Sequence, residues 1–218
     1  MIETVKLILA LALNLTIVGL EVFTLTKLSD KKEILKYYTY LSNLIALIGS
    51  TVFVAVTLWN LIGGNPAPIW LKGIRFTSTY MLVTTLFVFS LVLLPSHKSG
   101  NTITAADFIG ISPKLANLIL HYLCPVISAV SFILLERQPV LAGSEWTLYA
   151  AFPTIGYWTI YLILTTFNLW KDPYGFSQPS EKSGSVMSVI AGIAMFALIP
   201  AMSMGLDYLL WWLNTLNF

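Results

Sequence analysis

The sequence has little of three kinds of feature, and each shortage excludes a class of protein. Its 218 residues include one cysteine, Cys124, so neither a disulfide within the chain nor a cysteine-based metal site is possible. Charged residues make up 10% of the chain, whereas soluble domains carry about 25% because they need a solvated surface. The net charge of +2 is small and no basic cluster alternates with aromatics, so nucleic acid is not an expected partner.

Hydrophobic residues, by contrast, make up 57% of the chain, and the charged residues fall in short segments between long apolar runs. This layout is typical of an integral membrane protein. The first apolar run is longer than the core of a signal peptide, and no small-x-small cleavage site follows it. We therefore interpret it as a span of the mature protein.

Six apolar segments are long enough to cross a bilayer, which takes about 20 helical residues for roughly 30 Å of hydrocarbon. They cover residues 5–26, 38–61, 76–94, 115–135, 146–170 and 186–213. Tyrosine and tryptophan gather at their ends, as in the aromatic belts of membrane proteins. No internal repeat is visible. The sequence predicts an all-α integral membrane bundle of six transmembrane helices, forming a single domain over residues 1–218.

The basic residues indicate an orientation for this bundle. The first, third and fifth loops hold Lys27, Lys31, Lys32, Lys36, Lys98, Lys114, Lys171 and Lys182. The side with the termini holds Lys6, Lys72, Arg75 and Arg137. Because basic residues concentrate in cytoplasmic loops, we expect the odd loops in the cytoplasm and the termini outside.

His121, inside the fourth expected span, is the most informative single residue. A titratable imidazole in hydrocarbon is costly, so it usually faces a partner or a polar cavity. Thr39 lies near the start of the second span, and both spans begin on the side of the odd loops. We therefore expect both residues in the same half of the bilayer, with His121 roughly 9 Å below the start of its span. Pro125 cannot donate to the carbonyl of His121, which predicts a distorted helix beside the histidine.

Two interpretations of these residues stay open at this point. Helical spacing places Thr39, Ser42 and Asn43 on one face, and His121, Cys124, Pro125 and Ser128 on another. In the catalytic interpretation, the imidazole takes the proton of the Thr39 hydroxyl, and Asn43 supports an oxyanion or orients the base. In the structural interpretation, the hydroxyls bond carbonyls of their own helix and the histidine joins two helices.

The remaining ionisable groups of the spans have weaker signals. Glu21 lies late in the first span, where it could orient His121, bind a proton or reach the interface. We expect structural ion pairs between Glu136 and Asp207 on one side and Arg75 and Arg137 on the other. One intramembrane histidine and scattered acids do not make a ligand set, so no metal or other cofactor is expected.

Four short segments resemble a known family. Tyr37–Asn43 (YYTYLSN) resembles the start of the second span in the androgen-induced-gene family of membrane proteins and their bacterial six-span relatives, and Leu120–Val126 (LHYLCPV) resembles the start of the fourth. Leu148–Tyr157 and Asp172–Phe176 resemble the motifs within and after its fifth span. Mammalian members of that family are threonine hydrolases that cleave fatty acid esters of hydroxy fatty acids.

The resemblance implies a threonine-dependent lipid-ester hydrolase with Thr39 as nucleophile and His121 as base. The other expected site residues are Asn43, Ser42 and Glu21 as oxyanion or orienting groups, and Tyr38, Cys124 and Ser128 beside the substrate. The expected partner is a lipid or fatty acyl ester within the bilayer, and the expected location is a bacterial cell membrane. Asp172–Phe176 is expected to form an interfacial turn or a lid. Two alternatives stay open: a proton-coupled transporter with a Glu21–His121 relay, and a non-catalytic membrane scaffold.

Overall fold

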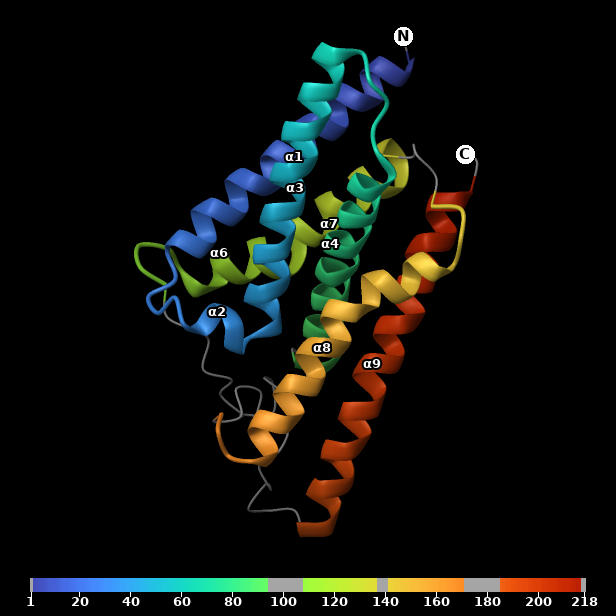
Figure 1. The fold of residues 1–218 in the computed structure, drawn as a ribbon. Coiled ribbons are helices and arrows are strands. Elements are labelled where there is room, and N and C mark those ends of the chain that lie inside the picture. Colours follow the sequence, from blue (N-terminus) through green and yellow to red (C-terminus); the bar gives the residue numbers. More distant parts are fainter. Residues whose placement is uncertain (1, 94–107, 137–140, 171–184, 217–218) are drawn as a thin grey trace.

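The computed structural model describes residues 2–93, 108–136, 141–170 and 185–216. Its helices are α1 (Ile2–Thr26), α2 (Glu33–Lys36), α3 (Tyr38–Gly63), α4 (Ile69–Val88), α6 (Pro113–Leu118), α7 (Cys124–Val130), α8 (Glu145–Thr166) and α9 (Ser185–Thr215), with π-helical turns η1 (Phe89–Leu93), η2 (Ile119–Leu123) and η3 (Ser131–Leu135). Within the described residues the only β-type pairing is one isolated bridge between Leu28 and Phe108. The all-α prediction is confirmed. Figure 1 shows an elongated bundle with both chain ends at the same end.

Five helical stretches among the described residues are long and apolar enough to cross a membrane. They are Glu3–Thr26, Tyr38–Gly63, Ile69–Leu91, Pro113–Leu135 and Glu145–Thr166. Large apolar side chains such as Ile62 and Phe152 are exposed on their outer faces, where lipid would cover them. Five such stretches with apolar outer faces indicate a multi-pass membrane protein. Helix α9 covers the sixth expected range, and its role as a sixth span stays a prediction.

Local chemistry accounts for several helix ends. The Ser112 hydroxyl accepts the backbone N–H of Leu115 ahead of α6, and Pro113 follows as the first helical residue. Helix α3 ends at Gly64, whose φ of 66° is left-handed and whose N–H bonds the carbonyl of Asn60. That conformation suits glycine because it has no Cβ.

The third span begins seven residues earlier than the sequence predicted, at Ile69 instead of residue 76. The expected third span, residues 76–94, leaves Lys72 and Arg75 outside the hydrocarbon. Both are buried instead, and Arg75 forms an ion pair with Glu136 inside the bundle. The ion pair with Glu136 offsets part of the free-energy cost of burying the Arg75 charge.

Helix α4 is the centre of the fold. It contacts α3 and α7 on one side and α8 and α9 on the other, and most of its side chains are buried. The largest core cluster joins α3, α4, α8 and α9 around buried aromatic residues, including Tyr38, Tyr80, Trp158 and Tyr161. Thus α4 separates the half of the bundle that holds α1 and α3 from the half that holds α8 and α9.

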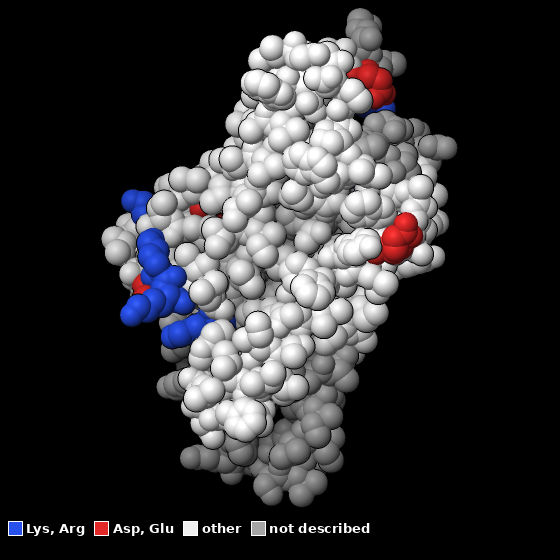
Figure 2. Space-filling view, in the orientation of Figure 1, with Lys and Arg blue, Asp and Glu red and all other residues white. Residues whose placement is uncertain are grey.

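Figure 2 shows most of the visible basic side chains gathered at the left of the view, near α2 and the end of α1, while most of the remaining described surface of that face carries no charge. This end contains Lys27, Lys31 and Lys32, which follow α1. Lys31 donates to the carbonyls of Leu25, Thr26 and Leu28 and so caps the C-terminal end of α1. The nucleophile expected from the sequence, Thr39, lies at this same basic end.

Candidate functional site

Thr39 and His121 meet although 82 residues separate them in the chain. The Thr39 hydroxyl oxygen lies 3.2 Å from Nε2 of His121, which is hydrogen-bond distance. Both residues are buried, with exposed fractions of 9% and 7%. Thr39 is the second residue of α3, and His121 lies in η2. The sequence placed them in the same half of the bilayer, and the structure brings them into contact.

The hydrogen-bond partner of Nδ1, the second ring nitrogen of His121, shows which of the two nitrogens carries the proton. Nδ1 lies 3.2 Å from the backbone carbonyl of Asn117, one turn earlier in the chain. A carbonyl oxygen only accepts hydrogen bonds, so Nδ1 carries the proton and donates it to this bond. The lone pair of Nε2 is therefore directed at the Thr39 hydroxyl, which donates to it. This is the tautomer that a general base for Thr39 requires.

The expected helix distortion beside Pro125 is a π-helical turn. Within it, the N–H of Cys124 bonds the carbonyl of Ile119, five residues back. Proline at 125 removes the bond to the His121 carbonyl and its ring crowds that carbonyl, and the wider turn relieves this crowding. Single π-turns inside helices occur frequently at functional sites.

Phe89 is a site residue that the sequence reasoning missed. Its ring stacks on the His121 imidazole, with centroids 3.8 Å apart and planes 27° apart, and it meets Tyr122 edge to face. Phe89 begins η1, the π-turn that ends the fourth helix in chain order. The contact fixes one face of the imidazole. No spacing in the sequence indicates it, since it depends on two irregular helical turns.

Asn43 and Ser42 hold the backbone around Thr39. The Asn43 amide nitrogen donates to the carbonyl of Thr39 at 2.6 Å and to the carbonyl of Leu120 at 3.3 Å. It therefore links the turn that carries Thr39 to the residue before His121. Ser42 donates to the Thr39 carbonyl at 2.9 Å and pairs with Thr85 of α4 at 2.7 Å. Of the two roles expected for Asn43, the geometry favours orientation, because its donor hydrogens are engaged by carbonyls.

The other expected site residues lie away from the reacting atoms. The Tyr38 hydroxyl bonds Thr154 of α8 at 2.7 Å, and its ring packs on Tyr157 and Trp158. Glu21 is fully buried, and neither of its carboxyl oxygens has a hydrogen-bond partner at bonding distance. Its neighbour is the buried thiol of Cys124. His121 is oriented by the Asn117 carbonyl and not by Glu21.

Ser128 belongs to a second polar cluster, away from the pair of Thr39 and His121. It pairs with Thr79 at 2.7 Å and accepts from Arg75 at 3.3 Å. It lies seven residues after His121, which is roughly 10 Å along a helix. Two residues on one helical face can thus lie at different depths, and the expected role of Ser128 beside a substrate stays a prediction.

The second cluster, which we call the arginine cluster, surrounds the ion pair of Arg75 and Glu136. Arg75 Nε lies 2.9 Å from Glu136, and both side chains are almost completely buried. The cluster members besides this pair are Asn14, Ser50, Ser78, Thr79, Ser128 and Ser131. The expected pairing of Glu136 with Arg75 is confirmed, and Arg137 lies outside the described residues. Asp207 forms no ion pair with another described residue, and a pairing with Arg137 stays a prediction.

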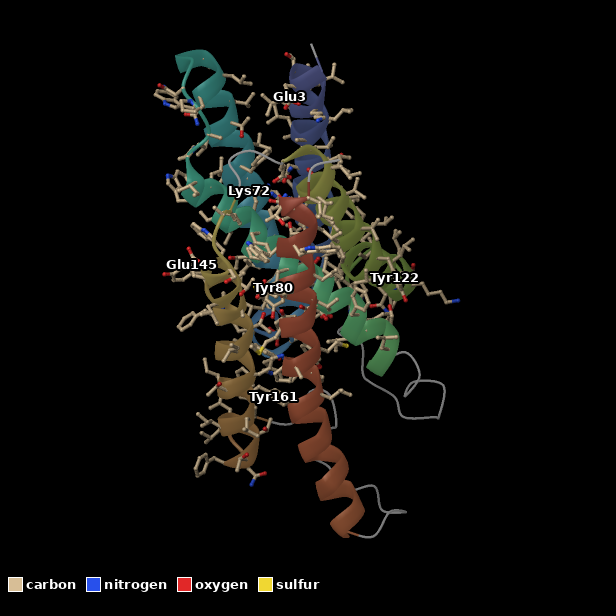
Figure 3. The ribbon with its side chains drawn as sticks, turned by 90° about the vertical axis from the view of Figure 1, so that its right-hand side faces the viewer. Glu3, Lys72, Tyr80, Tyr122, Glu145 and Tyr161 are labelled. Carbon is tan, nitrogen blue, oxygen red and sulfur yellow. The ribbon has the colours of Figure 1, made fainter. Side chains whose placement is uncertain are left out.

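One cavity of about 560 Å³ opens at the end of the bundle opposite Thr39. Glu136 and Leu135 form part of its lining, and Glu3 and Lys6 of α1 lie at its edge. Figure 3 shows Glu3 near the start of α1, at the top of the view. The cavity adjoins the arginine cluster and contains neither Thr39 nor His121 in its lining.

Among the described residues, no three His, Cys, Asp or Glu side chains gather closely enough to hold a metal ion. The expected lid or turn at Asp172–Phe176 lies outside the described residues. Comparison of the chain with protein-family models, with curated proteins and with solved structures found no match. The family resemblance of the Thr39 and His121 segments therefore remains an interpretation of motifs.

Proposed function

We propose that this protein is an intramembrane lipid-ester hydrolase in which Thr39 is the nucleophile and His121 the general base. The observation that carries the proposal is the hydrogen bond from the Thr39 hydroxyl to Nε2 of His121, with Nδ1 bonded to a carbonyl. A hydroxyl is a weak nucleophile until an adjacent base accepts its proton. Hydroxyls in the interior of membrane helices instead commonly bond a carbonyl four residues back, as Thr51 does on the same helix.

In the acylation step, the Thr39 oxygen attacks the ester carbonyl carbon while its proton moves to Nε2 of His121. The imidazolium then gives this proton to the leaving alcohol as the carbon–oxygen bond of the ester breaks. In the second step, water gives a proton to Nε2 and attacks the acyl-threonine, and the proton returns to Thr39 as the acid leaves. The carbonyl of Asn117 takes the orienting role that a carboxylate has in the serine hydrolase triad.

The N-terminal end of α3 supports the negative charge that develops during attack. Thr39 is the second residue of this helix, and no side chain caps the helix N-terminus. The N–H dipoles of a first helical turn create a positive potential that stabilises an adjacent anion. In this proposal the helix end acts on the oxyanion, and Asn43 holds the turn in place.

Two features of the surroundings of the pair support the proposed substrate class. Apolar side chains surround this end of the bundle, which suits an acyl chain arriving from the bilayer. Lysines 27, 31 and 32 lie at the same end, where they would attract a substrate with a free carboxylate. A fatty acid ester of a hydroxy fatty acid has both features, and it is the substrate class implied by the family resemblance.

An ester-hydrolysis assay on purified protein in detergent tests the proposal. Fatty acid esters of hydroxy fatty acids of several chain lengths are incubated with the wild type, Thr39→Ala and Thr51→Ala, and released acid is quantified by mass spectrometry. Hydrolysis by the wild type and Thr51→Ala, but not by Thr39→Ala, supports the proposal. Equal hydrolysis by Thr39→Ala would exclude Thr39 as nucleophile, and no hydrolysis of any ester by wild type would reject the function.

A further inference from the structure

The residues just before Thr39 are bonded by side chains of α8. The Tyr157 hydroxyl donates to the backbone carbonyl of Lys36 at 2.7 Å, and Lys36 is the last residue of α2. The hydroxyls of Tyr38 and Thr154 bond each other at 2.7 Å. Figure 1 shows the start of α3 beside the middle of α8. Helix α8 thus reaches the backbone three residues before Thr39 and the side chain directly before it.

These two bonds lie on either side of the junction between α2 and α3. The junction is a single residue, Tyr37, whose backbone is extended with φ of −107° and ψ of 127°. Because only one residue connects the two helices, the direction of α3 depends on what holds the residues before and after it. Thr154 and Tyr157 are three residues apart on one helix, so they share one face of α8. One helical face therefore bonds both sides of the junction.

Helix α8 gives this junction a rigid support. It packs against α4 and α9, and Thr154, Tyr157 and Trp158 are all buried. The Tyr38 ring packs on Tyr157, with centroids 5.3 Å apart, and on Trp158, with centroids 6.2 Å apart. Side chains in a close-packed core have little freedom to move. The hydroxyls of Thr154 and Tyr157 are therefore kept at their partners.

The base is oriented by other elements of the bundle. Nδ1 of His121 bonds the carbonyl of Asn117 in α6, and the ring of Phe89 in η1 stacks on the imidazole. Neither contact comes from α8. Helix α8 therefore acts on the position of Thr39 and not on the orientation of His121, so that the two effects can be measured separately.

We propose that Thr154 and Tyr157 are positioning residues, which hold Thr39 at hydrogen-bond distance from His121 by fixing the junction of α2 and α3. The expected effect on rate rests on the proposed function, whereas the effect on the contact of Thr39 with His121 does not. Misplacement of reacting groups by about 1 Å costs about 10²-fold, so loss of either bond should lower the maximal rate of hydrolysis at least about tenfold. The Michaelis constant should stay near wild type.

The test compares Tyr157→Phe and Thr154→Val with the wild type. Each substitution removes one hydroxyl and keeps the ring or the branched shape of the side chain. Thr154→Ser, which keeps a hydroxyl at this position, should behave as the wild type. Thr159→Val is the matched control on the same helix, since the Thr159 hydroxyl bonds the carbonyl of Ile155 in α8 itself. It should change neither the rate nor the contact of the catalytic pair.

The readout that does not need activity is the ¹⁵N NMR spectrum of histidine-labelled protein in detergent. The chain has two histidines, so His97→Ala leaves the ring nitrogens of His121 as the histidine-ring signals. Thr39→Ala gives the position of the Nε2 signal without the hydroxyl. In Tyr157→Phe and Thr154→Val, the Nε2 signal should move toward that position. The Nδ1 signal should stay in place, because its bond to a carbonyl is intact.

An Nε2 signal at the wild-type position in both variants would overturn the proposal, and a lower unfolding midpoint would then assign the two bonds to packing alone. Equal movement of both nitrogen signals would also overturn it, since that indicates a general disturbance of the bundle. So would an Nε2 signal that does not respond to Thr39→Ala. If the wild type hydrolyses no ester, the proposed function fails, and the Nε2 signals still decide this proposal. If Thr154→Val does not fold, Tyr157→Phe decides it alone.

Discussion

The two polar clusters, which lie at different depths along α3 and α4, differ in how their groups are satisfied. In the arginine cluster, the Glu136 carboxylate accepts from Arg75, Asn14 and Ser131, so that both charges are bonded. In the other cluster, a neutral threonine and a neutral histidine share one hydrogen bond, and the surrounding polar side chains hold the backbone. The first arrangement resists change, whereas the second leaves a proton free to move between two atoms.

This comparison teaches that buried polarity alone does not identify a reactive site in a membrane bundle. A charged network gains its stability from complete pairing, and removal of one partner leaves an uncompensated charge. A nucleophile and base need the opposite, a short contact that can rearrange. The following substitutions should therefore separate loss of turnover from loss of stability.

The largest expected effect is on turnover in His121→Ala. Removal of the base should lower the rate of ester hydrolysis by about 10²- to 10⁴-fold, the usual contribution of a positioned general base. The unfolding midpoint should fall less than in Glu136→Ala, because a neutral side chain with two neutral hydrogen bonds is lost and no charge is left unpaired. The same assay on His97→Ala serves as the histidine control, since His97 lies outside the expected spans. A His121→Ala protein with wild-type turnover would remove the base from the proposal.

The next effect is on stability in Glu136→Ala. This change leaves Arg75 buried without its partner, which should cost about 3–5 kcal/mol of unfolding free energy. Denaturant unfolding in detergent measures it, and Glu145→Ala, which alters an exposed acid at the start of α8, is the control. If Glu136→Ala were as stable as this control, the arginine cluster would not hold the fold together.

How far the sequence predicted these clusters depends on which groups compose them. The sequence predicted that Thr39 and His121 lie in the same half of the bilayer, because both are near the start of spans that begin on one side. It did not predict that they are in contact. The orienting groups were not, since the Asn117 carbonyl is a backbone atom and Phe89 reaches the imidazole through a π-turn. Residue types alone do not show where a helix departs from regular spacing.

The arginine cluster was predicted less well, for an electrostatic reason. The expected third span left Lys72 and Arg75 outside the membrane, and the ion pair that offsets the cost of burying Arg75 depends on a tertiary contact. The contacts of Ser128 with Thr79 and Arg75 also depend on tertiary packing. Helical spacing predicted which face of the helix carries Ser128. Only the packing of α7 on α4 determines which side chains surround it.

A smaller effect is expected in Asn43→Ala. Its amide fixes the carbonyls of Thr39 and Leu120, so its loss should displace the nucleophile relative to the base. Misplacement of reacting groups by about 1 Å costs about 10²-fold in rate. The maximal rate should fall while the Michaelis constant stays near wild type. Asn60→Ala on the same helix is the matched control, and an equal loss in both would show a general effect of the helix.

The smallest effect is expected in Phe89→Leu. The substitution removes the stacking on the imidazole but keeps an apolar side chain of similar bulk, so the loss should be about 0.5–1.5 kcal/mol. This corresponds to a two- to twelvefold slower turnover by the usual conversion of free energy to rate. Phe87→Leu, two residues earlier on the outer face, should leave turnover unchanged. A fall of the same size in Phe87→Leu would assign the effect to the helix instead of the ring.

The most direct measurement of the central claim is covalent labelling with an alkyl fluorophosphonate, followed by peptide mass spectrometry. The phosphonyl group should be found on Thr39 in the wild type, since only an activated hydroxyl displaces fluoride at a useful rate. Labelling should be strongly reduced in His121→Ala and retained in Thr51→Ala. A label on another residue, or one on Thr39 that does not depend on His121, would contradict the account.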